Sequence, residues 1–179
     1  MRYQSAVELR ADLKRAKRII ESGRTAHAAT SSISVAVLPF ENAGAQPELE
    51  YLSDGITEVL ICNLSRKPGL KVTARNTVFH FKGRTGDAVG IGKQLGVGSV
   101  VTGRVLKHGN SIRIGVELVD VRDGWQLWGE QYRRNVDELL FVEDEIPREI
   151  VGHLQQELIT LVQITNLESN ARKAEPLLS

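Results

Sequence analysis

The segment Gly86 to Lys93 (GDAVGIGK) has residue types that could bind phosphate. A nucleotide-binding loop of this kind spaces its glycines so that backbone amides cradle the phosphates, and it ends on Lys followed by Ser or Thr, which holds Mg²⁺. Here the spacing is one residue too long, and Gln94 stands where the hydroxyl is required. No buried strand leads directly into the segment. The sequence therefore favours a surface helix weakened by glycine over a nucleotide site.

The histidines and the single cysteine do not have the spacing of a metal site. His27, His80, His108 and His153 are scattered, and none lies at ligand spacing with Cys62 or with another histidine. A zinc site needs about four converging ligands. Cys62 falls beside the apolar face of an expected helix without a partner base, which favours a small core residue over a nucleophile. We expect no catalytic residue, metal or cofactor in this chain.

Four large apolar side chains are candidates for an interaction surface. Trp125 and Trp128 belong to one expected strand and point to opposite faces. At least one of them should therefore enter the core, and an exposed tryptophan would mark a binding surface. The other two candidates, Leu9 and Leu13, belong to an apolar stripe near the N-terminus.

That stripe predicts an amphipathic helix over residues 5–20. Its members recur at intervals of three and four and so share one face: Ala6, Leu9, Leu13, Ala16 and Ile20. Basic side chains from Arg10 to Arg18 lie off the stripe. A short helix with an uncovered stripe is marginal in water, so we expect weak self-association through residues 6–20. Residues 21–32 are small, polar and unpatterned, which is typical of a linker.

From residue 33 to about 162 the pattern is that of an α/β (α+β) domain. Five strands are expected, at residues 33–39, 70–74, 99–107, 112–118 and 125–133. In the fourth, apolar residues at 112, 114, 116 and 118 alternate with Arg113, Gly115 and Glu117, which is the period-two pattern of a half-buried strand. Helices are expected to begin at Ser53 or Asp54, at Asp87 and near Asp137. The order βαβαβββα predicts a mixed sheet with helices, preceded by the separate N-terminal helix.

Proline and glycine mark several boundaries of these elements. Asp123-Gly124 is a signal for a two-residue hairpin, because type I′ turns need positive φ at both central residues. Pro68-Gly69 should end the first helix of the domain. Pro147 should kink or restart the last helix, and residues 163–179 are expected to form a frayed tail.

Composition places the chain among ordinary globular proteins. It has 179 residues, of which 41% are hydrophobic and 25% charged, with a net charge of +1. This length suits one domain with appendages, and the small net charge gives no global attraction to nucleic acid or acidic membranes. No apolar run approaches the ~20 residues of a membrane-spanning helix. With no secretion signal at its start, the chain is assigned to the cytoplasm by default.

Ordered phrases between residues 35 and 146 carry a family resemblance. They include VAVLPF at 35–40, YLSDGITE at 51–58, GLKV at 69–72, FKG at 81–83, LGV at 95–97, LVD at 118–120, LW at 127–128 and DEI at 144–146. Residues 33–158 thereby resemble the TolB-amino-terminal-like domain, related to FlgO-like domains, of bacterial signalling proteins. The resemblance implies a mixed α/β domain with no known catalytic residues. Gly90, Gly92 and Gly98 depart from the family pattern and put local helix stability in question.

A second resemblance covers residues 2–18. The phrase RYQSA at 2–6, followed by Glu8-Leu9 and Asp12-Leu13, resembles the last helix of bacterial serine/threonine protein kinases. The glycine-rich loop, the strand lysine, the catalytic aspartate and the metal-binding aspartate of a kinase are all missing from the sequence. We therefore do not expect this chain to transfer phosphate.

Taken together, these features predict a non-catalytic regulatory, sensory or protein-interaction domain of a kinase-type signalling protein, of which this chain is a fragment. One alternative is a nucleic-acid-binding module that uses the basic N-terminal helix, although no aromatic or groove-reading module accompanies that helix. Another is an active kinase whose catalytic domain lies upstream. The protein partner or small ligand is not identified by the sequence.

Overall fold

The computed structural model describes residues 32–84 and 86–174, and those from Ile33 onward belong to one compact unit. Residues Met1–Ser32 form a separate unit. The expected N-terminal helix, with Leu9, Leu13 and its basic residues, lies outside the described residues, as does nearly all of the expected linker. Self-association through residues 6–20 therefore stays a prediction.

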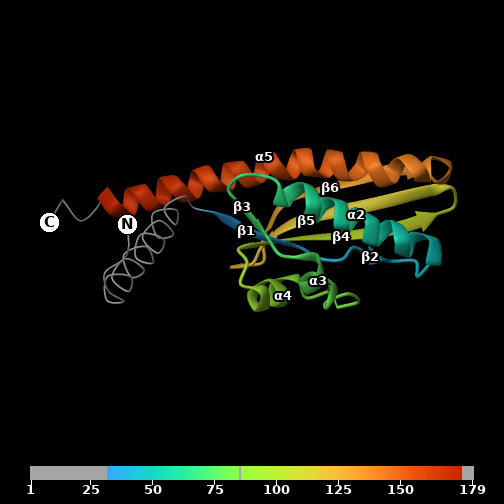
Figure 1. Cartoon of the computed structure of the whole chain (residues 1–179), viewed down its shortest axis with the longest axis horizontal. Coiled ribbons are helices and arrows are strands. Elements are labelled where there is room, and N and C mark those ends of the chain that lie inside the picture. Colours follow the sequence, from blue (N-terminus) through green and yellow to red (C-terminus); the bar gives the residue numbers. More distant parts are fainter. Residues whose placement is uncertain (1–31, 85, 175–179) are drawn as a thin grey trace, which may run out of the picture. The chain divides into compact units, whose positions relative to one another are not determined.

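A six-stranded mixed sheet forms the centre of the domain (Figure 1). Its strands are β1 (Ile33–Val37), β2 (Glu41–Asn42), β3 (Leu70–Val72), β4 (Ser99–His108), β5 (Ser111–Asp120) and β6 (Gln126–Asn135). The order is β3-β1-β4-β5-β6, and β2 pairs with β4. β1 is parallel to both β3 and β4, whereas β4, β5 and β6 form an antiparallel meander. The expected mixed α/β class is confirmed.

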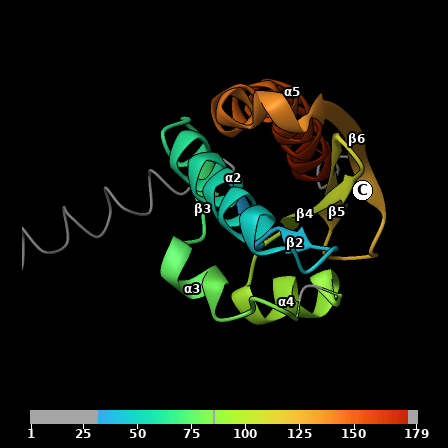
Figure 2. The same cartoon turned by 90° about the vertical axis from the view of Figure 1, so that its right-hand side faces the viewer.

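Helices cover both faces of this sheet, to different extents. They are α2 (Pro47–Ser65), α3 (Arg75–Phe79), α4 (Ala88–Leu95) and α5 (Leu139–Ala174), the last preceded by a 3-10 turn at Val136–Glu138. Figure 2 shows α2 and α5 on one side of the sheet and the shorter α3 and α4 on the other. Among the described residues, no helix is both long enough and apolar enough to span a membrane.

The core lies between the sheet and the pair α2 and α5. Every second residue of β5, from Ile112 to Leu118, is buried there, and the alternate residues face the other side. This is the period-two pattern expected from the sequence. The largest fully buried side chains of the two helices are Leu49, Leu52, Ile56, Leu60, Leu64, Ile146, Ile150 and Leu154.

Helix α2 begins at Pro47, earlier than the expected caps Ser53 and Asp54. Proline is favoured in the first turn, because its φ is preset and the amide that it lacks would have no helical partner. Ser53 does not cap; its hydroxyl is buried inside the helix and donates to the Leu49 carbonyl at 2.8 Å. The hydroxyl has a partner in mid-helix, so the expectation of a cap at this residue was wrong.

The hairpin between β5 and β6 is longer than the two-residue turn expected from Asp123-Gly124. The Asp120 amide donates to the Trp125 carbonyl at 2.9 Å, and the Gly124 amide donates to the Asp120 backbone carbonyl at 2.9 Å. The loop therefore spans residues 121–124, with Gly124 at φ 76°. Glycine does supply the positive φ here, and the Asp120 carboxylate accepts a hydrogen bond from the Arg122 amide within the loop at 2.8 Å.

This loop should make stability depend on the Asp120 carboxylate. Hydrogen bonds from Arg122, the shortest 2.7 Å, hold the pKa of Asp120 below its ordinary value, although burial opposes the shift. As pH falls below the unfolded value of ~3.9 towards the lowered folded pKa, the unfolded chain binds the proton first, and this stabilisation is lost. We expect Asp120→Asn to lower the thermal midpoint at pH 7 and to flatten its fall between about pH 4 and pH 2.

Thermal unfolding followed by circular dichroism from pH 2 to pH 7 measures this dependence. Asp123→Asn is the matched control, because Asp123 is exposed and, among the described residues, its carboxylate accepts a hydrogen bond only from the Trp125 amide at 3.1 Å. If both variants keep the pH dependence of the wild type, Asp120 does not supply it.

Helix α5 runs unbroken through Pro147 to Ala174, so it does not restart at Pro147, and residues 163–174 of the expected tail belong to the helix. A proline inside a helix removes one hydrogen bond and costs about 3 kcal/mol. Pro147 is itself buried, between Val142 and Ile150 of the same buried stripe. Packing of this stripe on α2 and the sheet holds the helix together on both sides of the proline.

Candidate functional site

Helix α4 covers one end of the sheet face that lies opposite α2 and α5. A Cβ atom at Gly92 would lie 2.4 Å from a methyl group of Val121 and 2.8 Å from one of Val100. Glycine at this position therefore lets the helix approach β4 and β5 closely. The expected cap is confirmed, since the Asp87 carboxylate accepts from the Gly90 amide at 2.9 Å. Gly92 is thus explained by close packing, and Gly90 by the cap, because a Cβ atom at Gly90 would collide with the Asp87 carboxylate.

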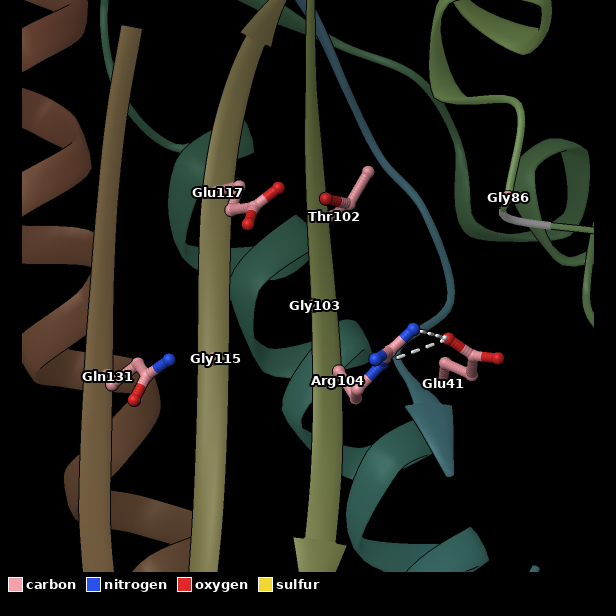
Figure 3. A pocket seen from close by; sticks show the side chains of 8 residues that line it. All are labelled: Glu41, Gly86, Thr102, Gly103, Arg104, Gly115, Glu117 and Gln131. Carbon is pink, nitrogen blue, oxygen red and sulfur yellow. Dashed lines mark hydrogen bonds and ion pairs between the residues drawn. The ribbon is translucent and has the colours of Figure 1, made fainter. Parts of the chain in front are cut away.

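Beyond α4 the same face contains an open hollow of about 340 Å³ (Figure 3). It is lined by Glu41, Gly86, Thr102, Gly103, Arg104, Gly115, Glu117 and Gln131. The strands position these side chains through their register, which places Arg104 opposite Gly115 and Gly115 opposite Gln131. The next pairs along the strands place Thr102 opposite Glu117. The hollow is therefore built from residues that are distant in sequence.

The polar side chains of the hollow are only partly paired. Arg104 donates through Nε and Nη2 to Glu41 Oε2 at 3.3 and 3.2 Å (Figure 3). Both side chains are more than half exposed, so this ion pair adds only about 0–1 kcal/mol to stability. Within residues 32–84 and 86–174, the side-chain carboxylate of Glu117 has neither an ion pair nor a hydrogen bond. The hollow thus offers a free carboxylate beside a cation that is already paired.

Gly115 forms the centre of the hollow's floor, halfway along β5. No heavy atom lies within 4 Å of where its Cβ would be. Neither crowding nor a positive φ requires glycine here, although glycine weakens a strand interior. Glycine in a strand often marks a place where a ligand or another backbone approaches closely. The lack of a side chain at Gly115 thus leaves room there for a ligand or another backbone.

The chemistry of this lining suits binding. None of the eight lining residues is a histidine, cysteine or lysine. In the described part of the chain, no group of three or more His, Cys, Asp or Glu side chains is arranged to hold a metal ion. The lining combines hydrogen-bond donors and acceptors with the carboxylate of Glu117, and within residues 32–84 and 86–174 no hydrogen bond joins that carboxylate to the Thr102 hydroxyl on the opposite strand.

Residues 30–146 match the model of a protein family described as HilA/YgeH-like transcriptional regulator, second domain. The chain belongs to this family. The HilA/YgeH-like domain is also 43% identical over 125 residues to a putative adenylate cyclase 3 of Rhizobium meliloti (strain 1021). That alignment covers 70% of this chain and 21% of the relative, so the chain matches only about a fifth of the relative's length.

One solved structure gives support at the level of the fold. The HilA/YgeH-like domain superposes on the crystal structure of TolB from Acinetobacter baumannii with a TM-score of 0.50, at 14% identity, over 71% of this chain and 28% of that one. The expected TolB-like fold is therefore supported. These comparisons bear neither on the FlgO relation nor on the kinase-like helix at residues 2–18.

The two tryptophans of the HilA/YgeH-like domain do not form one surface. Trp125 is 74% exposed and belongs to the hairpin, just before β6. Trp128 is half-buried, with its ring centroid 6.1 Å from that of His153 on α5. The pairing of β5 with β6 is irregular between these two tryptophans, since Leu118 pairs with Trp128 and the next residue, Val119, pairs with Gln126. One tryptophan faces the core and the other faces solvent, as expected, but neither lines the hollow.

Next to Trp128, a cluster of polar side chains joins β6 to α5. The Tyr132 hydroxyl lies 3.1 Å from Glu130 Oε2 and 3.2 Å from His153 Nδ1, and His153 lies 2.7 Å from Glu130. Burial raises the pKa of Tyr132 above its ordinary value of 10, and the bond to Glu130 acts in the same direction. The phenol therefore stays protonated and acts as a structural link.

The expectation that Cys62 is a core residue was wrong. Cys62 is exposed on α2, because the buried face of that helix passes through Leu60, Ile61 and Leu64 on the opposite side.

The hollow itself was missed from the sequence. Arg113, Gly115 and Glu117 alternate with the buried residues of β5 and so share one face, but none of them was among the site residues expected from the sequence. The available signal was Gly115, a glycine in the middle of an otherwise regular strand pattern.

Proposed function

We propose that this domain is a non-catalytic regulatory module that binds a ligand or a protein partner within a larger bacterial signalling protein. One observation carries the proposal: related domains occur in proteins named for different outputs, a transcriptional regulator and a putative adenylate cyclase. A module shared by proteins with different outputs supplies neither output itself. Its role is regulatory, next to the domain that produces the output of each protein.

The hollow supports a binding role for this module. It contains the Glu117 carboxylate, which has no partner in the part of the chain that the structure describes, hydrogen-bonding side chains at Thr102 and Gln131, and the bare backbone of Gly115. The side chains can form hydrogen bonds with a polar ligand or protein surface, and the lack of a side chain at Gly115 leaves room for it.

The resemblance of residues 2–18 to the last helix of a kinase catalytic domain supports a finer proposal. The parent would be a cytoplasmic serine/threonine kinase, with this domain following its catalytic part. The chain itself would remain without enzymatic activity, because the kinase motifs are absent from its sequence.

The test is a direct assay of the purified chain for both chemistries. We expect no phosphate transfer to itself or to generic protein substrates, and no cyclic nucleotide, when the chain is incubated with labelled ATP and either Mg²⁺ or Mn²⁺. A mock purification from cells that lack the chain gives the background, and Glu117→Gln removes the free carboxylate of the hollow. Turnover above background that falls in Glu117→Gln would show that the domain is an enzyme and would overturn the proposal.

A further inference from the structure

Two arginines lie side by side at the rim of the hollow. Arg113 of β5 is directly opposite Arg133 of β6, and on the other side of Arg113 lies Leu106 of β4. This row is adjacent to the row of Arg104, Gly115 and Gln131 that lines the hollow. Both arginines are exposed and point to the face left open by α2 and α5.

Neither arginine is neutralised by the domain. Within residues 32–84 and 86–174, neither guanidinium has a hydrogen bond or an ion pair. Arg104, the other cation on this face, is already paired with Glu41. Like charges directly opposite each other on neighbouring strands destabilise a sheet. The facing Arg113 and Arg133 therefore destabilise the sheet, and among the described residues no carboxylate pairs with either of them.

The surroundings favour a protein segment over a small ligand. Small ligands usually occupy concave sites that bury most of their surface, whereas this row lies on an open sheet face. Leu106 is 36% exposed beside Arg113 and adds an apolar contact. Arginine is enriched at protein interfaces and frequent among the residues that dominate binding energy.

We propose that Leu106, Arg113 and Arg133 dock an acidic protein segment, with a carboxylate of the partner lying between the two guanidinium groups. Guanidinium groups bind carboxylates in a paired, directional geometry, and such charge-assisted bonds are stronger than neutral ones. The rest of the segment crosses Gly115, where no side chain obstructs it. This inference names the partner for the proposed function and rests on it.

Fluorescence anisotropy with a labelled eight-residue peptide of glutamates interleaved with serine and leucine tests the docking. We expect the wild-type chain to bind this peptide at low salt and Arg113→Glu/Arg133→Glu to weaken the binding by about tenfold or more. A peptide with lysine in place of each glutamate should not bind this face.

The matched control is Arg66→Glu/Arg148→Glu, which makes the same change in net charge at two exposed positions on α2's end and on α5. It should leave peptide binding within about twofold of the wild type, well under the tenfold that ~1.4 kcal/mol produces. The control matters because the basic residues 10–18 of the same chain can also attract an acidic peptide. Equal losses in both double variants would mean general charge attraction and would overturn the proposal.

A stability measurement separates docking from a structural role. Arg133→Glu alone places opposite charges across the two strands, so its thermal midpoint should rise slightly while peptide binding falls. A fall in both would assign the arginines to the fold and overturn the proposal. Absence of binding at millimolar peptide, or displacement of the peptide by inorganic phosphate or a short oligonucleotide at lower concentration, would also overturn it. None of these outcomes depends on the assay for catalysis.

Discussion

Gly103→Val is expected to lower the free energy of unfolding by about 3 kcal/mol, whereas Gly115→Val should leave it unchanged or raise it by up to about 1 kcal/mol. A Cβ at Gly103 would lie 2.3–2.4 Å from ring atoms of Phe40, which is buried at 2% exposure. Added atoms there must displace an aromatic ring within a packed core. A Cβ at Gly115 meets nothing within 4 Å, and valine suits a strand better than glycine.

Urea denaturation of the two variants measures the contrast, because the residue types and the substitution are the same. A double-mutant cycle of Gly103→Ala with Phe40→Leu identifies the cause. If the ring is the obstacle, the double variant should lose less stability than the sum of the single losses. Additive losses, or equal effects of valine at the two positions, would contradict the packing at Gly103.

Thr57→Val is expected to lower the free energy of unfolding by about 1–3 kcal/mol. The fully buried Thr57 hydroxyl accepts from the Phe40 amide at 3.0 Å and donates to the Ser53 carbonyl at 2.8 Å. Valine keeps the shape but leaves the amide of Phe40 without an acceptor inside the core. The hydroxyl thus joins the segment between β1 and β2 to helix α2, and its removal should release this connection.

Thr57→Ser is the control, because it keeps the hydroxyl and removes only a methyl group, worth about 0.8 kcal/mol. Amide hydrogen exchange gives a local readout, since the Phe40 amide should lose protection in Thr57→Val and keep it in Thr57→Ser. If the Phe40 amide stays equally protected in both variants, the hydrogen bond does not hold this part of the chain.

Local patterns were sufficient for most elements of this fold. The alternation of Ile112 to Leu118 identified β5 and its buried face, and Asp87 with Gly96 marked both ends of α4. These signals operate within one element and do not depend on distant residues. The start of α2 was missed because the capping pattern placed it at Ser53 or Asp54. The helix in fact begins at Pro47, and Ser53 is buried inside it.

The candidate site could not be predicted in the same way. Its members come from β2, β4, β5, β6 and the segment before α4, and they meet only through strand register. A shift of one residue in that register would move Arg113 and Gly115 to the opposite face. The juxtaposition of Arg113 and Arg133 is likewise a property of the pairing of β5 with β6, which sequence alternation alone does not specify.

The position of β1 in the sheet affects the order in which the chain can fold. Its parallel neighbours are supplied by Leu70–Val72 and by residues 99–101, far downstream, whereas β4, β5 and β6 are joined by short hairpins. Non-local pairing closes long loops and is slow, and local hairpins form early. During synthesis β1 leaves the ribosome before either neighbour exists. Its apolar sequence ISVAV therefore waits with both edges unpaired until Leu70–Val72 has been made, and with one edge unpaired until the chain has grown past Val101.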